Sequence, residues 1–157
     1  MGDVLMITNF HSRYWGVNFT LNNDFNFISN LHCFGDYDTT LIFITEELNF
    51  EDIDSLDEFN KISDSFFKAS YNNFLWLRTD INNVYSLLAE ESYFQDYDYN
   101  LNFDECTFKN EIASRIALIK IISITFYPSN SFIVEFAIKD SYYSIWFDEN
   151  KNIDLDY

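Results

Sequence analysis

Hydrophobic and polar positions alternate along the first third of the chain, a pattern typical of β-strands. The segments "YWGVNFTL" (14–21) and "FNFISNLHCF" (25–34) are rich in aromatic and β-branched residues, and turn-forming residues 22–24 separate them. After Gly35, the apolar run Leu41–Ile44 within "TTLIFITEEL" is typical of a buried strand. The pattern predicts three strands in this region.

The period changes in the middle of the chain. Apolar residues recur there at intervals of three and four, which predicts an amphipathic helix; they are Leu56, Phe59, Ile62 and Phe66. Ser55 followed by Glu58 fits a capping box at its start. A second, shorter helix is predicted from Asp80 to about Glu91, with four inward residues: Ile81, Val84, Leu87 and Leu88.

The last third returns to strands. The runs 116–127, "SFIVEFAI" and "YYSIWF" are separated by turns at 128–130 and 139–141, and "DENKN" precedes the short end "IDLDY". Consecutive hairpins favour an antiparallel meander. With no internal repeat or linker, residues 1–157 are predicted to form a single α+β domain: an antiparallel sheet with a C-terminal meander and two helices packed on one face.

Composition supports a packed core and adds a strong charge. The chain has 157 residues, 48% of them hydrophobic, including 18 Phe, 11 Tyr and 3 Trp. Nine Lys+Arg against 26 Asp+Glu give a net charge of −17, and the stretch from Asp36 to Glu105 alone has 17 acidic and 3 basic residues. Such a field repels nucleic acid and anionic membranes and attracts a basic partner. The alternative is that the acidity only keeps an aromatic-rich protein soluble.

Targeting signals and cysteines favour a cytoplasmic location. The N-terminus lacks the basic region and long apolar stretch of a secretory signal. The longest apolar stretch, 116–127, is interrupted by Lys120 and is too short to span a bilayer. Cys33 and Cys106 are expected to be buried thiols in a reducing compartment rather than a disulfide.

The stretch "DYDYNLNFDE" (96–105) resembles the start of a calcium loop, with Asp, Asp and Asn at alternate positions. A calcium loop of the EF-hand type needs Gly at position 6 and Glu at position 12, where this chain has Leu101 and Thr107. Flanking helices are not expected either, because the sequence soon after Phe108 is strand-like. We therefore expect no metal or other cofactor, and interpret the stretch as an extended segment with one acidic and one aromatic side.

Catalytic signatures are lacking. His32 is adjacent to Cys33, and neighbours on a strand point to opposite faces, so a Cys–His dyad is not expected. The acidic pairs, such as Glu46–Glu47 and Glu51–Asp52, are typical of solvated surfaces in so acidic a chain. We expect no catalytic residues and no enzyme activity.

Residues 90–105 combine acids with aromatics and contain no Lys or Arg. Tyr provides contact area at low entropic cost, and neighbouring acids can pair with the basic groups of a partner. The alternative is that the aromatics cover the core and only the acids are in water. The predicted partner-binding residues are Glu90, Glu91, Asp96, Tyr97, Asp98, Tyr99, Asp104 and Glu105.

The layout also resembles a known class of proteins. Early strands, "TTLIFITEELNFEDIDSLDEFNKISDSFFK" leading into a helix, and "SITFYPSNSFIVEFAIKDSYYSIWFDENKNIDLDY" as a closing meander are similar to small bacterial immunity proteins of polymorphic toxin and contact-dependent inhibition systems. The resemblance runs from about residue 18 to the end, and "FDENKN" departs from it because the closing turn has no Gly.

The resemblance implies an inhibitor that binds and neutralises a cognate toxin domain stoichiometrically, without catalytic residues of its own. The acidity independently favours a basic, nuclease-type toxin, because a nuclease must attract phosphate. Two alternatives from other classes stay open: a nucleic-acid mimic that inhibits a DNA-binding protein, and an enzyme that uses buried carboxylates.

Overall fold

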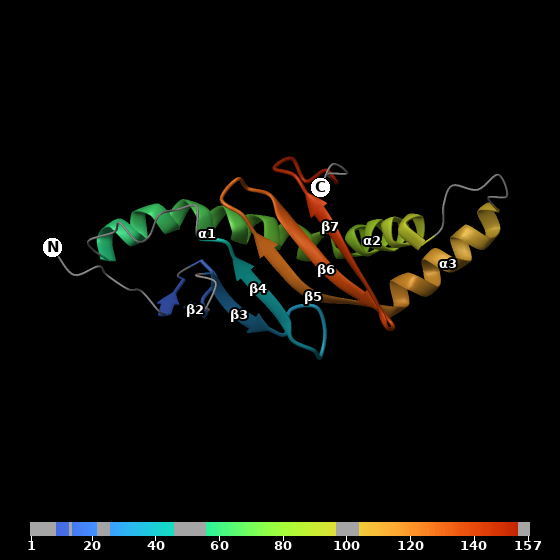
Figure 1. The fold of residues 1–157 in the computed structure, drawn as a ribbon, viewed down its shortest axis with the longest axis horizontal. Helices are drawn as coiled ribbons and strands as arrows, with labels where there is room; N and C mark the ends of the chain where they lie inside the picture. The colour runs from blue at the N-terminus through green and yellow to red at the C-terminus, as the bar shows by residue number, and fades with distance from the viewer. Residues whose placement is uncertain (1–8, 13, 22–25, 46–55, 97–103, 154–157) are drawn as a thin grey trace.

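The computed structural model describes residues 9–12, 14–21, 26–45, 56–96 and 104–153, and these form seven strands and three helices. The strands are β1 (Asn9–His11), β2 (Asn18–Leu21), β3 (Phe27–Leu31), β4 (Thr39–Phe43), β5 (Ile119–Phe126), β6 (Phe132–Ile138) and β7 (Ser141–Phe147). The helices are α1 (Leu56–Thr79), α2 (Ile81–Asp96) and α3 (Glu105–Leu118). The α+β class is confirmed (Figure 1).

The strands lie in the sheet in the order of the chain, from β1 to β7. The predicted C-terminal meander is confirmed, because β5–β6 and β6–β7 are antiparallel pairs. The prediction of a wholly antiparallel sheet is wrong at one pair, since β4 and β5 run parallel. Parallel neighbours need a long crossover connection, and all three described helices lie between these two strands in the chain.

The helices differ from the predicted pair in number and length. Helix α1 begins at Leu56, as the capping pattern predicts, but it continues to Thr79, and α2 continues to Asp96. Helices α1 and α2 run one after the other behind the sheet. Helix α3 lies against α2 at one side of the molecule and runs back toward the start of β5 (Figure 1). Helix α3 was not predicted, and Ile116–Leu118, expected to be strand, are its last turn. None of the described helices has the length and apolarity that a membrane span requires.

An aromatic core joins α1 to the sheet. Phe43 on β4 is fully buried, and its ring centroid lies 4.6 Å from that of Phe19 and 5.0 Å from that of Phe67 on α1. Trp15 packs on Phe43 at 5.4 Å and donates its indole N–H to the Phe67 carbonyl at 3.2 Å. Aromatic rings bury large apolar areas each, so this layer fixes the position of α1 on the sheet.

Candidate partner-binding site at the α2–α3 end

The described acidic residues predicted to bind a partner lie on α2 and α3, two helices that pack against each other. Glu90 and Glu91 lie on α2, the first exposed and the second half-buried, and Asp96 is the last residue of that helix. Asp104 and Glu105 are exposed at the start of α3. Tyr97, Asp98 and Tyr99 lie outside the described residues. The described members therefore belong to two helix ends, although the sequence pattern predicts an extended segment from Asp96 onward.

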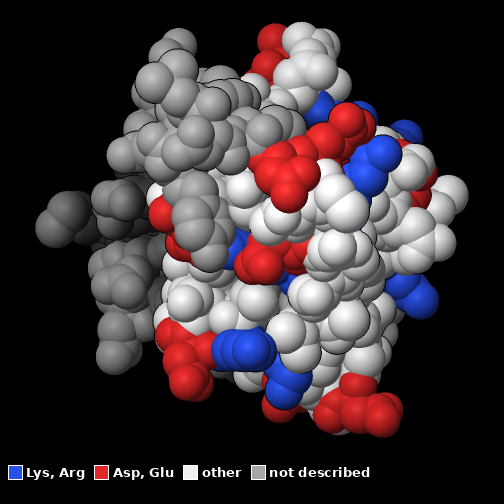
Figure 2. Space-filling model, turned by 90° about the vertical axis from the view of Figure 1, so that its right-hand side faces the viewer, with Lys and Arg blue, Asp and Glu red and all other residues white. Residues whose placement is uncertain are grey.

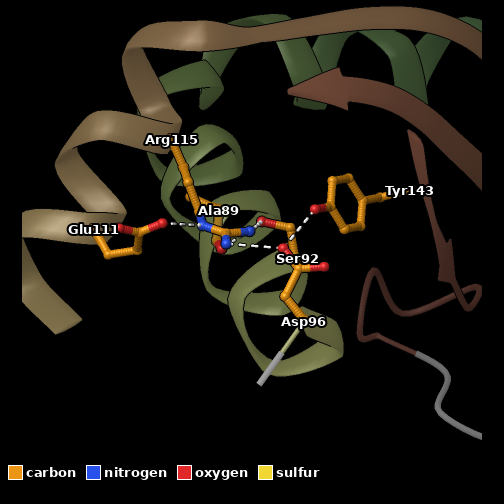
Figure 3. Close-up of polar contacts among 6 residues, drawn as sticks. All are labelled: Ala89, Ser92, Asp96, Glu111, Arg115 and Tyr143. Carbon is orange, nitrogen blue, oxygen red and sulfur yellow. Dashed lines mark hydrogen bonds and ion pairs between the residues drawn. The ribbon is translucent and has the colours of Figure 1, made fainter. Parts of the chain in front are cut away.

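Asp96 has an internal partner in Arg115 of α3. The Arg115 Nη2 donates to the Asp96 Oδ2 at 2.8 Å, and Nη1 donates to the Ser92 hydroxyl at 2.9 Å (Figure 3). The Arg115 Nε donates to the Glu111 carboxylate at 3.3 Å, one helical turn away. The hydroxyl of Tyr143 on β7 donates to the same Asp96 oxygen at 2.6 Å. One carboxylate thus joins α2, α3 and the sheet.

The surroundings keep this network charged. The Arg115 side chain is 8% exposed, and its guanidinium carbon lies 5.7 Å from the centre of the Tyr93 ring. Burial alone lowers the pKa of Arg115, but the contacts with Asp96 and Tyr143 outweigh burial and raise it above its ordinary value. Burial, and then the hydrogen bond to Asp96, raise the pKa of the Tyr143 hydroxyl. The guanidinium stays protonated, and Tyr143 stays a hydrogen-bond donor.

Asp104 is the N-cap of α3. Its carboxylate accepts hydrogen bonds from the Thr107 hydroxyl at 2.6 Å and from the Cys106 backbone N–H at 3.1 Å. These two bonds, in that order, lower the pKa of Asp104. Glu105 follows in the first turn, where a negative charge suits the helix dipole, and it pairs with Lys109 at 3.3 Å. Capping explains why a helix begins at residues that the alternating pattern did not assign to one.

The aromatic residues of this end cover the core. Tyr93 and Phe94 on α2 are half-buried, and their ring centroids lie 5.0 and 5.7 Å from that of Phe108 on α3. The acids beside them are more open. Burial, followed by the charge of Glu90, raises the pKa of Glu91. Among the described residues, this end follows the alternative in which aromatics pack inward and acids meet water.

Sequence reasoning missed Arg115 and Tyr143, which hold the site together. Glu111 and Arg115 are four residues apart, which is the spacing of a helical ion pair, and this was the available signal once a helix was assigned there. The contact of Asp96 with Tyr143 joins residues 47 positions apart in the chain, and no local pattern predicts it.

The resemblance of residues 96–105 to a calcium loop can be compared with the helices on either side of that stretch. The expectation that flanking helices are absent is wrong, because α2 ends at Asp96 and α3 begins at Glu105. Leu101 and Thr107 still occupy the positions where an EF-hand needs Gly and Glu. The described residues contain no group of three or more His, Cys, Asp or Glu side chains placed to hold a metal ion.

The histidines and cysteines of the described chain have separate contacts. His32 Nε2 lies 2.7 Å from the Asp38 carboxylate at the surface, while the neighbouring Cys33 thiol donates to the Leu31 carbonyl at 3.7 Å. Burial raises the pKa of Cys33, which disfavours the reactive thiolate. Cys106 is exposed on α3, contrary to the expectation of a buried thiol.

Searches against protein-family models, curated proteins and solved structures find no match to the chain. The candidate site is therefore interpreted from its own geometry and charge.

Proposed function

We propose that this chain is an immunity-type inhibitor that binds a basic, nuclease-type toxin domain stoichiometrically and has no turnover of its own. The observation that carries the proposal is that acidic residues outnumber basic ones at the α2–α3 end and that the basic residues there are already paired. From Ile81 to Leu118 the sequence has seven acidic residues and two basic ones, Lys109 and Arg115. Both cations are engaged by acids of the same end. We infer that a basic partner neutralises further acids of this end, such as the exposed Glu90.

The α3 side of the molecule presents acidic side chains that a basic protein can approach. In Figure 2 the α3 side of the molecule has several acidic patches with basic side chains between them, and residues outside the described ranges cover a part of it. Distributed negative charge raises the rate of encounter with a basic protein and adds less to the lifetime of the complex. The acidic end is therefore assigned to steering and orientation.

The two alternatives have less support. A nucleic-acid mimic presents acids at the regular spacing of phosphates, whereas acids and bases are interspersed on this side (Figure 2). Catalysis by carboxylates requires an enclosed group with a displaced pKa. Among the described Asp and Glu side chains none is fully buried, and Glu91 is a half-buried group on the surface of α2.

Co-purification with a toxin domain encoded next to this gene tests the proposal. We expect a one-to-one complex and loss of toxin activity. Glu90→Lys with Glu105→Lys should slow association about tenfold at low salt and flatten its salt dependence, because two exposed acids of the site become basic.

Asp36→Lys with Glu149→Lys is the matched control. Both residues are exposed, both lie outside the α2–α3 end, and the double change alters the net charge equally. A smaller loss in the control supports the site. Equal losses would assign the effect to net charge alone, and a wild-type chain that neither binds nor inhibits the toxin domain would refute the function.

A further inference from the structure

The two faces of the sheet differ in how they are covered. Along β4, Leu41 and Phe43 are fully buried beneath the helices, and Ile42 between them points to the opposite face. In Figure 1 helices α1 and α2 lie behind the sheet, and none of the described helices lies in front of it. An antiparallel sheet with one uncovered face normally has polar residues there. The open face of this sheet has large apolar side chains.

Strand register places these side chains in one line. Ile28 pairs with Ile42, Ile42 with Thr125, Thr125 with Ile133, and Ile133 with Trp146. The line crosses β3 to β7, and strand spacing gives it a length of about 20 Å. Ile28, Ile42, Ile133 and Trp146 are each half-buried, so their outer atoms contact solvent. Thr125, at the centre of the line, is buried, so the four half-buried apolar side chains form a stripe on either side of it. An apolar stripe that reaches solvent on a sheet face marks a candidate interaction site.

The β7 end of the line has a preformed aromatic and acidic corner. The rings of Tyr127 and Trp146 stack with centroids 4.9 Å apart. Glu135 is exposed on the same face, two residue pairs further along β6 and β7, and its carboxylate accepts a hydrogen bond from the Ser123 hydroxyl at 3.2 Å. The register makes Glu135 and Trp146 diagonal neighbours on this face, a spacing that one Arg or Lys side chain can bridge with a charge-assisted bond and a cation–π contact.

Charge selects the occupant of this face. A second copy of the chain or an anionic lipid surface would be repelled by the charge of −17. Lys120, which the register also places on the open face, lies over the ring of Tyr37 at 5.8 Å. Lys120 is thus engaged with Tyr37, and the hydrogen bond that Glu135 accepts comes from the neutral Ser123 hydroxyl.

We propose that the open sheet face is the docking surface for the basic protein partner. Apolar side chains of the partner pack along Ile28, Ile42 and Ile133, and one of its Arg or Lys side chains binds between Trp146 and Glu135. This inference rests on the proposed function and assigns the two surfaces different roles. The α2–α3 end raises the association rate, and the open face provides the contacts that keep the partner bound.

Paired substitutions test this division. Ile133→Thr with Trp146→Thr removes half of the apolar line and keeps residues with high β-propensity. We expect the dissociation constant for the toxin domain to rise about 30-fold or more, mainly through faster dissociation, as for hot-spot residues. Glu135→Gln should weaken binding about three- to tenfold and make it less sensitive to salt.

Leu75→Gln is the control. Leu75 is an apolar residue of α1 that is 39% exposed, so the change removes apolar surface outside both the open face and the α2–α3 end. Binding within about threefold of wild type is expected. If the toxin domain binds and the open-face variant retains wild-type affinity, the inference is overturned while the proposed function survives.

A second measurement decides the inference even if the toxin domain does not bind. A short synthetic peptide of alternating Leu and Arg is titrated into the wild-type protein, and the methyl and indole N–H signals are followed by NMR. The signals of Ile42, Ile133 and Trp146 should shift, those of Leu75 should not, and an alternating Ser and Arg peptide should shift the open-face signals less. Shifts confined to other surfaces, or the same response to both peptides, would overturn the inference. Gel filtration of the same samples measures whether the chain forms dimers. A dimer would identify a second copy of the chain as the occupant of the face and would also overturn the inference.

Discussion

Helix α1 and the α2–α3 end are joined to the same sheet by different kinds of contact. The inner side of α1 is aromatic, and Phe67 packs among Phe19, Phe27 and Phe43. The last turns of α2 and α3 are connected to β7 through Arg115, Asp96 and Tyr143, in a polar network. The apolar contact has no directional requirement, whereas the polar network needs each donor and acceptor in place.

The difference has consequences for stability and for function. Apolar burial contributes in proportion to area, so the α1 layer dominates the free energy of unfolding. A charged network offsets the cost of desolvation only when it is complete, so it adds less stability but fixes the direction in which α3 extends. The aromatic layer therefore determines whether the chain folds, and the network determines how the acidic end is presented.

The largest expected effect is at the aromatic layer. Phe43→Ala removes a fully buried ring that contacts five other aromatic residues: Trp15, Phe19, Phe66, Phe67 and Phe126. We expect the free energy of unfolding to fall by about 3–5 kcal/mol, a large part of the stability of a domain. Urea unfolding followed by circular dichroism measures the change. Tyr142→Ala, at a residue 73% exposed, serves as control and should stay within about 0.5 kcal/mol.

The second prediction concerns the polar network. Arg115→Met keeps the apolar stem and removes the charge, which leaves Asp96 without its guanidinium. Breaking a fully buried ion pair costs about 3–5 kcal/mol. The Asp96 and Glu111 side chains are 37% and 39% exposed, so water can solvate both carboxylates when the guanidinium is removed. We therefore expect the free energy of unfolding to fall by about 1–3 kcal/mol.

Hydrogen exchange separates a local effect from a global one for Arg115→Met. Protection should fall in α3 and the last turns of α2, while α1 stays protected. A uniform loss of protection would mean that the network and the aromatic layer form one cooperative unit, and the contrast between the two regions would then be wrong.

The same contrast explains what the sequence could predict. Strands β2, β3, β4, β6 and β7 and the start of α1 follow from hydrophobic patterns, because their inward residues are apolar. Helix α3 has no such stripe: its buried residues are Ile112 and Arg115. A helix whose central inward residue is Arg escapes a method based on apolar spacing, and the Ile-rich run that follows it favoured a strand from Ile116 onward.

The parallel pairing of β4 with β5 was unpredictable for another reason. Local turns determine hairpins, and they correctly predicted the meander. Thr40 and Ser123 are partners in the sheet although 83 residues separate them in the chain, and only the packing of the helices decides which strand β5 joins. Likewise, the acids of the candidate site could be chosen from composition, but the internal role of Asp96 required the position of Arg115.

The smallest expected effect tests the α2–α3 end through pH. Burial and the charge of Glu90 raise the pKa of Glu91 above its ordinary value of 4.5. The folded state therefore binds this proton more tightly than the unfolded state, so the ionised carboxyl destabilises the protein at neutral pH. Glu91→Gln should raise the melting temperature at pH 7 by no more than about 2 °C, because the carboxyl is partly solvated. The advantage should shrink as the pH falls through the folded pKa of Glu91 and should disappear below 4.5.

Asp104→Ala provides a control of opposite sign for that experiment. The hydrogen bonds from Thr107 and from the Cys106 N–H lower the pKa of Asp104 below 3.8, so its stabilising contribution is present above 3.8 and is lost as the pH falls through the folded value. Asp104→Ala should therefore lower the melting temperature at pH 7, and its charge-dependent effect should vanish in acid. Scanning calorimetry of both variants across this range compares the two acids directly. If Glu91→Gln instead lowers the melting temperature at pH 7, the Glu91 carboxylate has a stabilising partner, and its assignment as an acid left for the partner to neutralise would be wrong.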